Sequence, residues 1–146
     1  MILYLMRHGK AEDVAETDAK RALTHEGRFQ VEDVAHAMLK REWPLPKKLV
    51  ASEYLRAKET AEIMAEVLGI RDVKFVSYEE ATQWPHMRGY LGNEPILFVS
   101  HQPELGEIIT ELTGKSLSVK KSSLHKIDYD MLKDTGRYLD KIERTK

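Results

Sequence analysis

Short apolar runs alternate along this chain with longer segments whose apolar residues repeat at helical spacing. The runs Ile2–Met6 and Ile96–Val99 are apolar throughout, which is typical of strands buried on both faces of a sheet. The helical stripes are Val31, Val34, Ala35, Met38 and Leu39, then Ala57, Thr60, Ala61, Met64 and Leu68, then Leu105, Ile108, Ile109 and Leu112. Strands that alternate with helices of this length favour a mostly parallel sheet covered by helices.

Weaker signals complete the expected order of elements. Lys48–Ala51 and Val73–Val76 predict two further strands, and Gly69 and Gly114 stand where helices should end. Near the C-terminus, a turn over residues 133–136 is flanked by Leu124, Ile127 and Tyr129 and by Tyr138, Leu139 and Ile142. This pattern predicts a final hairpin. Residues 77–93 carry little signal. We therefore expect residues 1–146 to form a single domain, a three-layer α/β/α sandwich with a mostly parallel mixed sheet and an antiparallel C-terminal contribution.

Composition excludes several functional classes. The 146 residues carry 23 Lys and Arg and 24 Asp and Glu, a formal charge of −1, which lacks the basic character of a nucleic-acid binder. The absence of cysteine excludes disulfides, thiolate metal sites and cysteine nucleophiles. The first apolar run is too short for a signal-peptide core, and no segment approaches a membrane span, so we expect a cytoplasmic protein.

Positively charged and imidazole side chains follow the predicted buried strands. Arg7 and His8 come directly after the first strand, Ser52 and Arg56 follow the second, and His101 follows the strand at residues 96–99. Ligands bind at the carboxyl ends of strands in open α/β sheets, so these side chains should converge on one edge. Each residue alone is ordinary, because a single arginine is most often a solvated surface charge. Their coincidence indicates a site.

An anion is the ligand that such a group of side chains requires. Clustered guanidinium groups repel one another, and their planar donors match carboxylate or phosphate. Helix N-termini near Ser52 and Pro103 would add backbone donors, which favours phosphate. The sequence contains no glycine-rich phosphate loop and no Asp/Glu cluster at metal-ligand spacing, so we expect neither a nucleotide cofactor nor a metal.

Four ordered motifs resemble those of one family. Arg7-His8-Gly9 resembles the Arg-His-Gly signature of the histidine phosphatase (phosphoglycerate mutase-like) superfamily, which also follows the first strand. Residues 18–27 are similar to its Asp-x-x-Arg-x-Leu-Thr-x-x-Gly segment, and residues 52–60 to its Ser-x-x-x-Arg-Ala-x-x-Thr element. Residues 100–103, Ser-His-Gln-Pro, complete the set. The compact length and the form of the second motif look most like the small SixA-type phosphohistidine phosphatase branch.

The resemblance implies a role for each matching residue. His8 would be the nucleophile and become transiently phosphorylated, while Arg7, Arg56 and His101 would bind the transferring phosphoryl group. Gly9, Arg21 and Ser52 are further candidates for substrate binding. Arg21 could equally be a surface residue of a mobile loop, and Ser52 is more simply a helix N-cap.

The leaving group raises a separate question. Relatives that act on alcohol phosphates use a carboxylic acid to protonate the leaving oxygen, and Glu79 and Glu80 lie in the corresponding region, although solvated loop carboxylates are the simpler interpretation. Without an acid the substrate needs a good leaving group, and phosphohistidine provides one. Residues 77–93 are too short for a large cap, so the pocket should be open and suit a phosphorylated partner protein, which Lys120 and Lys121 could guide.

We therefore expect a metal-independent phosphatase that acts through a phosphohistidine intermediate, most simply on phosphohistidine of a partner protein, and releases inorganic phosphate. Two alternatives stay open. One is a small-molecule phosphomonoesterase of the same fold. The other is a non-catalytic phosphoprotein-binding module, which would have no need for an unprotonated histidine amid arginines. His25, His36, His86 and His125 match no motif and are expected to be structural or exposed.

Overall fold

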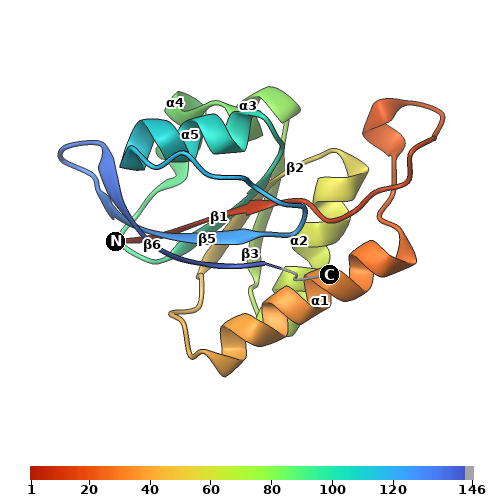
Figure 1. The fold of residues 1–146 in the computed structure, drawn as a ribbon, viewed down its shortest axis with the longest axis horizontal. Coiled ribbons are helices and arrows are strands. Elements are labelled where there is room, and N and C mark those ends of the chain that lie inside the picture. The colour runs from red at the N-terminus through yellow and green to blue at the C-terminus, as the bar shows by residue number, and fades with distance from the viewer. Residues whose placement is uncertain (144–146) are drawn as a thin grey trace.

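A six-stranded sheet in the order β3-β2-β4-β1-β5-β6 forms the centre of the computed structural model, which describes residues 1–143 (Figure 1). The strands are β1 Ile2–Arg7, β2 Lys48–Ser52, β3 Asp72–Val76, β4 Ile96–Ser100, β5 Leu124–Asp130 and β6 Thr135–Ile142. The helices are α1 His25–Lys40, α2 Leu55–Leu68, α3 Tyr78–Thr82, α4 Trp84–Met87 and α5 Glu104–Thr113, with short 3₁₀ turns η1 Asp18–Lys20 and η2 Arg88–Tyr90. The expected α/β sandwich is confirmed.

Helices cover both faces of the sheet (Figure 1). On one face α1 and α2 bury a core that includes Val31, Val34, Met38, Ala61 and Met64. On the other face α3, α4 and α5 bury Trp84, Met87, Leu105, Ile108 and Ile109 against the strands. Because β1 and β4 contact both cores, their apolar runs are continuous rather than alternating.

The sheet is mixed, because its two C-terminal strands pair in antiparallel fashion. Strands β3, β2, β4 and β1 are parallel to one another, whereas β5 runs antiparallel to β1, and β6 runs antiparallel to β5. The predicted C-terminal hairpin is therefore confirmed, although Thr135 and Gly136 already belong to β6 and the turn lies before them.

Residues 77–93 fold into α3, α4 and η2, which the sequence pattern did not reveal. Each contains at most five residues, too few to show a helical period. One local signal was present. Ser77 and Glu80 form a capping box, in which the Ser77 hydroxyl accepts from the Glu80 N–H while the Glu80 carboxylate accepts from the Ser77 N–H.

Two details of the sequence interpretation are wrong. Ser52 is the last residue of β2 rather than a helix N-cap, because α2 begins only at Leu55. The Ser52 hydroxyl instead accepts a hydrogen bond from the Tyr54 N–H at 3.2 Å, which stabilises the turn between strand and helix. Leu39 was expected on the buried stripe of α1 but is exposed near the end of that helix. No helix among residues 1–143 is long and apolar enough to cross a membrane.

The end of α2 gives a direct test of backbone strain. Gly69 follows α2 with φ of 72°, and a Cβ added there would meet no atom within 4 Å. We expect Gly69→Ala to lower the free energy of unfolding in urea by about 1 kcal/mol, because only the left-handed conformation opposes the methyl group. Gly92→Ala is the matched control, since Gly92 also has open space around it but no positive φ. Equal effects of the two substitutions would contradict this explanation.

Candidate active site

The carboxyl ends of β1 and β4 bring two histidines together. The strands pair in parallel with Arg7 beside Ser100, and the His8 N–H donates to the Ser100 carbonyl at 3.2 Å. The His8 and His101 rings consequently lie with their centroids 5.1 Å apart, and both side chains are buried. The structure therefore brings together the two histidines that the sequence placed after separate strands.

Arg56 reaches the same point from the first turn of α2. Its Nε donates to His8 Nε2 at 3.3 Å. A guanidinium can only donate, so Nε2 must carry a lone pair and the ring proton must be on Nδ1. The Nδ1–H then donates to the Gly9 carbonyl oxygen at 2.8 Å. His8 is thus held as the neutral tautomer whose Nε2 faces the cationic side of the site.

The backbone after His8 needs a glycine. A Cβ on Gly9 would lie 2.8 Å from Val31 Cγ2, which is closer than side-chain packing allows. The Gly9 N–H donates to Thr60 Oγ1 at 3.0 Å, so the chain turns tightly against α2 at this residue. Gly9 therefore fixes the direction of the loop that leaves His8.

Burial sets the protonation of both histidines. Burial lowers the pKa of His8 to about 4; the positive charges of Arg56, Arg7 and Arg21 act in the same direction, and the hydrogen bond to Gly9 opposes them. Burial also lowers the pKa of His101 to about 3, with further contributions from His8 and Arg56. Both rings are therefore neutral at neutral pH, and His8 retains the lone pair that a nucleophile requires.

Several buried polar atoms at this sheet edge lack hydrogen-bond partners within residues 1–143. They are Arg7 Nε, both ring nitrogens of His101 and Ser122 Oγ. Arg7 is otherwise held by its Nη1, which donates to the Val119 carbonyl at 2.9 Å. Buried donors are normally satisfied, so unpaired donors gathered at one place indicate a site for an anion.

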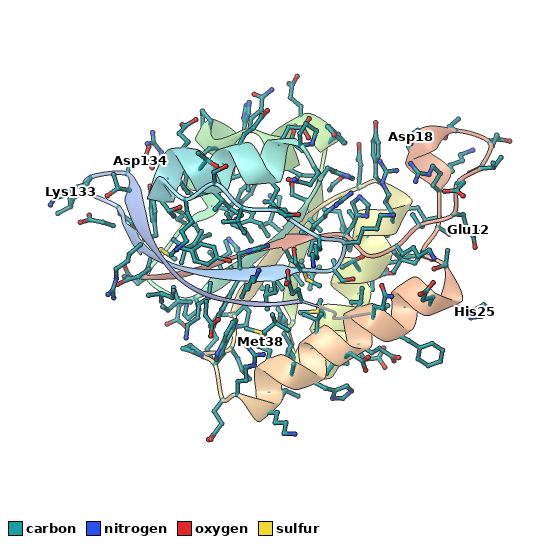
Figure 2. The ribbon with its side chains drawn as sticks, in the orientation of Figure 1. Glu12, Asp18, His25, Met38, Lys133 and Asp134 are labelled. Atoms are coloured by element: carbon teal, nitrogen blue, oxygen red, sulfur yellow. The ribbon has the colours of Figure 1, made fainter. Side chains whose placement is uncertain are left out.

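Asp18 is the site residue whose contacts sequence reasoning missed. It lies in η1, on a loop that projects at the end of the molecule opposite the hairpin turn carrying Lys133 and Asp134 (Figure 2). Arg56 Nη1 donates to the Asp18 carbonyl at 2.8 Å and Nη2 to its carboxylate at 3.2 Å. The motif around residues 18–27 contained this aspartate, so its match to the family segment was the available signal.

The same motif secures that loop. Arg21 donates to the Asp18 carboxylate at 2.8 Å and to the Glu12 carbonyl at 2.7 Å, so its side chain braces the loop beside the site. Thr24 accepts from the Gly27 N–H and caps α1, and the Thr24 N–H donates to the Lys10 carbonyl. Arg21 and Arg56 thus bind the same carboxylate, that of Asp18.

The remaining candidates lie outside this cluster. The Glu80 carboxylate caps α3, whereas the Glu79 side chain is exposed and forms no hydrogen bond or ion pair with the described residues. Lys120 and Lys121 are exposed, as are His25, His36 and His86. His125 is buried and hydrogen-bonded to the Ser123 and Tyr138 hydroxyls. Residues 1–143 contain no group of three or more His, Asp or Glu that could hold a metal ion.

The sequence is similar to one protein family and to two curated proteins. The model of the histidine phosphatase superfamily (branch 1) matches residues 3–84. A phosphohistidine phosphatase SixA homologue from Haemophilus influenzae is 30% identical over 135 residues, covering 79% of each chain. An uncharacterized protein from Picosynechococcus is 30% identical over 143 residues, covering 85% of this chain and 82% of its own.

Solved structures share the fold. The protein histidine phosphatase SixA complexed with tungstate superposes with a TM-score of 0.84 at 21% identity, covering 98% of this chain and 97% of its own. A phosphoserine phosphatase from Entamoeba histolytica in complex with phosphoserine has a TM-score of 0.70 at 14% identity, covering 95% of both chains. At these identities the similarity establishes the three-dimensional architecture.

The lowered pKa of His8 predicts a dependence of stability on pH. The folded pKa of about 4 lies below the usual value of about 6.5, so the unfolded chain binds more protons between these values. Stability should be complete above about pH 6.5 and fall as pH decreases toward about 4. When the pH is lowered from about 7.5 to about 5, the free energy of unfolding measured in urea should fall in both proteins. The fall should be about 2 kcal/mol smaller for His8→Gln than for the wild type. An identical loss in both proteins would contradict a buried neutral His8.

Proposed function

Because this chain belongs to the histidine phosphatase superfamily, we propose that it is a phosphatase whose nucleophile is His8 and whose substrate is phosphohistidine on a partner protein. The observation that carries the proposal is the hydrogen bond from Arg56 Nε to His8 Nε2, which shows that the imidazole is neutral at Nε2 and presents its lone pair to the cations of the site. A module that only bound phosphate would gain nothing from this arrangement, because a protonated histidine attracts an anion more strongly.

In the first step, His8 Nε2 attacks the phosphorus in line. A bond from Nε2 to phosphorus forms as the phosphorus–nitrogen bond of the substrate breaks, and the substrate imidazole, whose other ring nitrogen carries a proton, departs as a neutral group with the electron pair. Arg56 Nε must release its bond to Nε2 as the attack begins, and it can then donate to a phosphoryl oxygen instead. The His8 Nδ1–H remains bound to the Gly9 carbonyl and stabilises the charge that develops on the ring.

The phosphoryl oxygens require donors that are already in place. Arg7 Nε and the single N–H of the neutral His101 ring are buried and unpaired among the described residues, so they can bind an oxygen without breaking a protein contact. Prepositioned donors of this kind stabilise the equatorial charge of a phosphoryl transition state with little reorganisation. His101 takes up a proton when it binds the dianion, because the added negative charge opposes the effect of burial on its pKa.

In the second step, water attacks the phosphorus of the phosphorylated His8. The bond from Nε2 to phosphorus breaks, inorganic phosphate leaves, and the proton lost by the water accompanies the product. The same donors stabilise both steps, since each passes through a similar arrangement of phosphoryl oxygens. The free lone pair of Nε2 is thereby restored.

The carboxylates near the site support a nitrogen leaving group. Asp18 is bound by Arg21 and Arg56, and these contacts lower the pKa of its carboxyl group, so it stays ionised at neutral pH and cannot donate a proton. Glu80 is engaged in capping α3, and Glu79 points to solvent. A phosphorylated imidazole needs less help from an acid than an alkyl phosphate does, because imidazole is a better leaving group than an alkoxide.

Removing the nucleophile tests the proposed reaction. We expect the wild type to release phosphate from a histidine-phosphorylated protein in the presence of a chelator, and His8→Ala to lower that rate by roughly 10⁴-fold or more. Brief incubation with ³²P-labelled substrate should label the wild type but not the variant. His36→Ala, which removes an exposed histidine of α1, should keep full activity. Phosphate release that survived in His8→Ala would contradict the proposal.

A second experiment tests the monoesterase alternative. We expect Glu79→Gln and Glu80→Gln to change phosphohistidine hydrolysis by less than about threefold, since neither carboxylate contacts the site residues. If either variant lost about 10²-fold or more on an alkyl phosphate that the wild type hydrolyses, that glutamate would be the general acid. The protein would then be a phosphomonoesterase of this family.

A further inference from the structure

The His101 ring is oriented without a hydrogen bond. Neither ring nitrogen has a partner within residues 1–143, although the side chain is buried. Active-site imidazoles usually have one nitrogen bound to a carbonyl or carboxylate, and this bond fixes the ring. Some other contact must therefore hold His101 in the direction from which it can bind a phosphoryl oxygen.

Two tyrosines provide that contact. The Tyr78 ring stacks on His101 with centroids 4.4 Å apart and planes at 26°. Tyr54 meets the imidazole nearly edge-on, at 5.4 Å and 69°, and contacts Tyr78 at 4.9 Å. These are favourable geometries for aromatic pairs. Both tyrosines are half-buried, so they line the rim of the site rather than its floor.

The position of Tyr78 is fixed from two sides. Its hydroxyl donates to the Glu104 carboxylate, with 3.2 Å to each oxygen, and Glu104 begins α5 three residues after His101. Tyr78 is also the first residue of α3, whose N-terminus is capped by the Ser77–Glu80 capping box. The Ser100 hydroxyl at the end of β4 donates to the Ala81 carbonyl and so links α3 to that strand. The ring is thus anchored to the elements on both sides of His101.

We propose, on the basis of the function proposed above, that Tyr78 is a positioning residue that sets the orientation of the His101 imidazole by stacking, and that Glu104 holds Tyr78 in place. Tyr54 extends this arrangement to the second phosphoryl-binding group, because the Arg56 guanidinium carbon lies 5.1 Å from the centre of the Tyr54 ring. The aromatic rim consequently connects His101 with Arg56.

The charges around Tyr78 agree with this role. Burial raises the pKa of Tyr78 to about 12, and Glu104 contributes in the same direction. The phenol therefore remains protonated at neutral pH and keeps donating to the carboxylate. When His101 gains a proton on binding an anion, its positive charge lies against the face of the Tyr78 ring, which attracts a cation.

A double-mutant cycle measures whether Tyr78 acts through His101. The probe is tungstate, whose binding to the full chain is measured by titration calorimetry for the wild type, Tyr78→Leu, His101→Ala and the double variant. We expect Tyr78→Leu to weaken binding about tenfold, and Tyr78→Phe, which keeps the stacked ring, by less than about threefold. In the His101→Ala background, Tyr78→Leu should cause no further loss, because the ring it positions is gone.

Tyr90→Leu is the matched control, since Tyr90 is a half-buried tyrosine that lies with Lys48 and Lys74 near the opposite ends of the strands. It should leave tungstate affinity unchanged. Additive losses from Tyr78→Leu and His101→Ala would overturn the inference, because Tyr78 would then act independently of His101. If Tyr78→Leu fails to fold, Glu104→Ala replaces it in the same cycle, with Glu104→Gln expected to restore affinity by again accepting from the phenol.

The outcomes also separate this inference from the proposed function. A wild type that binds tungstate and loses phosphatase activity in His8→Ala supports the function whatever the result of the cycle, and additive losses then overturn only the role of Tyr78. A wild type that binds no tungstate overturns the inference about Tyr78, whereas a wild type that releases no phosphate overturns the proposed function. In the supporting case, the imidazole NMR signals of His101 should shift in Tyr78→Leu but not in Tyr90→Leu.

Discussion

Parallel pairing of β1 with β4 is the constraint on which the rest of the site depends. The register that sets Arg7 beside Ser100 brings His8 and His101 to the same sheet edge, and continuous apolar burial on both faces of these strands keeps that register in place. The helix that follows β2 then delivers Arg56 to the same edge. A shift of one residue in either strand would exchange its side chains between the two cores and spoil the packing of both, so the site is maintained by the same packing that stabilises the fold.

Gathering cations without a bound anion has an electrostatic cost, and the structure shows how it is limited. Burial keeps His8 and His101 neutral, so the two imidazoles add no charge to the arginines. The Asp18 carboxylate neutralises part of Arg56 and Arg21 from the projecting loop. It is 61% exposed, so it can move away at small cost when a phosphoryl group competes for Arg56. The buried polar atoms that remain unpaired at this sheet edge belong to Arg7, His101 and Ser122.

Secondary-structure elements were predicted correctly from the sequence where their apolar pattern was long enough to recognise. Strand β4 was recognisable because Ile96–Val99 is apolar at every position, and α2 because its stripe extends to Leu68 before a glycine. The segment of residues 77–93 was not recognisable, since its helices α3 and α4 span little more than one turn each and cannot show a repeated apolar stripe. Ser52 was misassigned for a related reason. A serine after a strand caps a helix or closes a turn with the same chemistry, and only the backbone of residues 53 and 54 decides between them.

The sequence alone determined which groups can carry the chemistry and in what order they appear. Arg7 ends β1, His8 and His101 each follow a strand, and Arg56 lies in the first turn of α2. Local patterning is enough to place these four residues at one sheet edge. Tertiary structure decided how these groups act. The tautomer of His8 depends on Arg56, the state of Asp18 on two arginines, and the orientation of His101 on Tyr78 and Glu104. These contacts join residues from separate elements at specific distances and angles, and only the packing of the layers against one another sets such geometry.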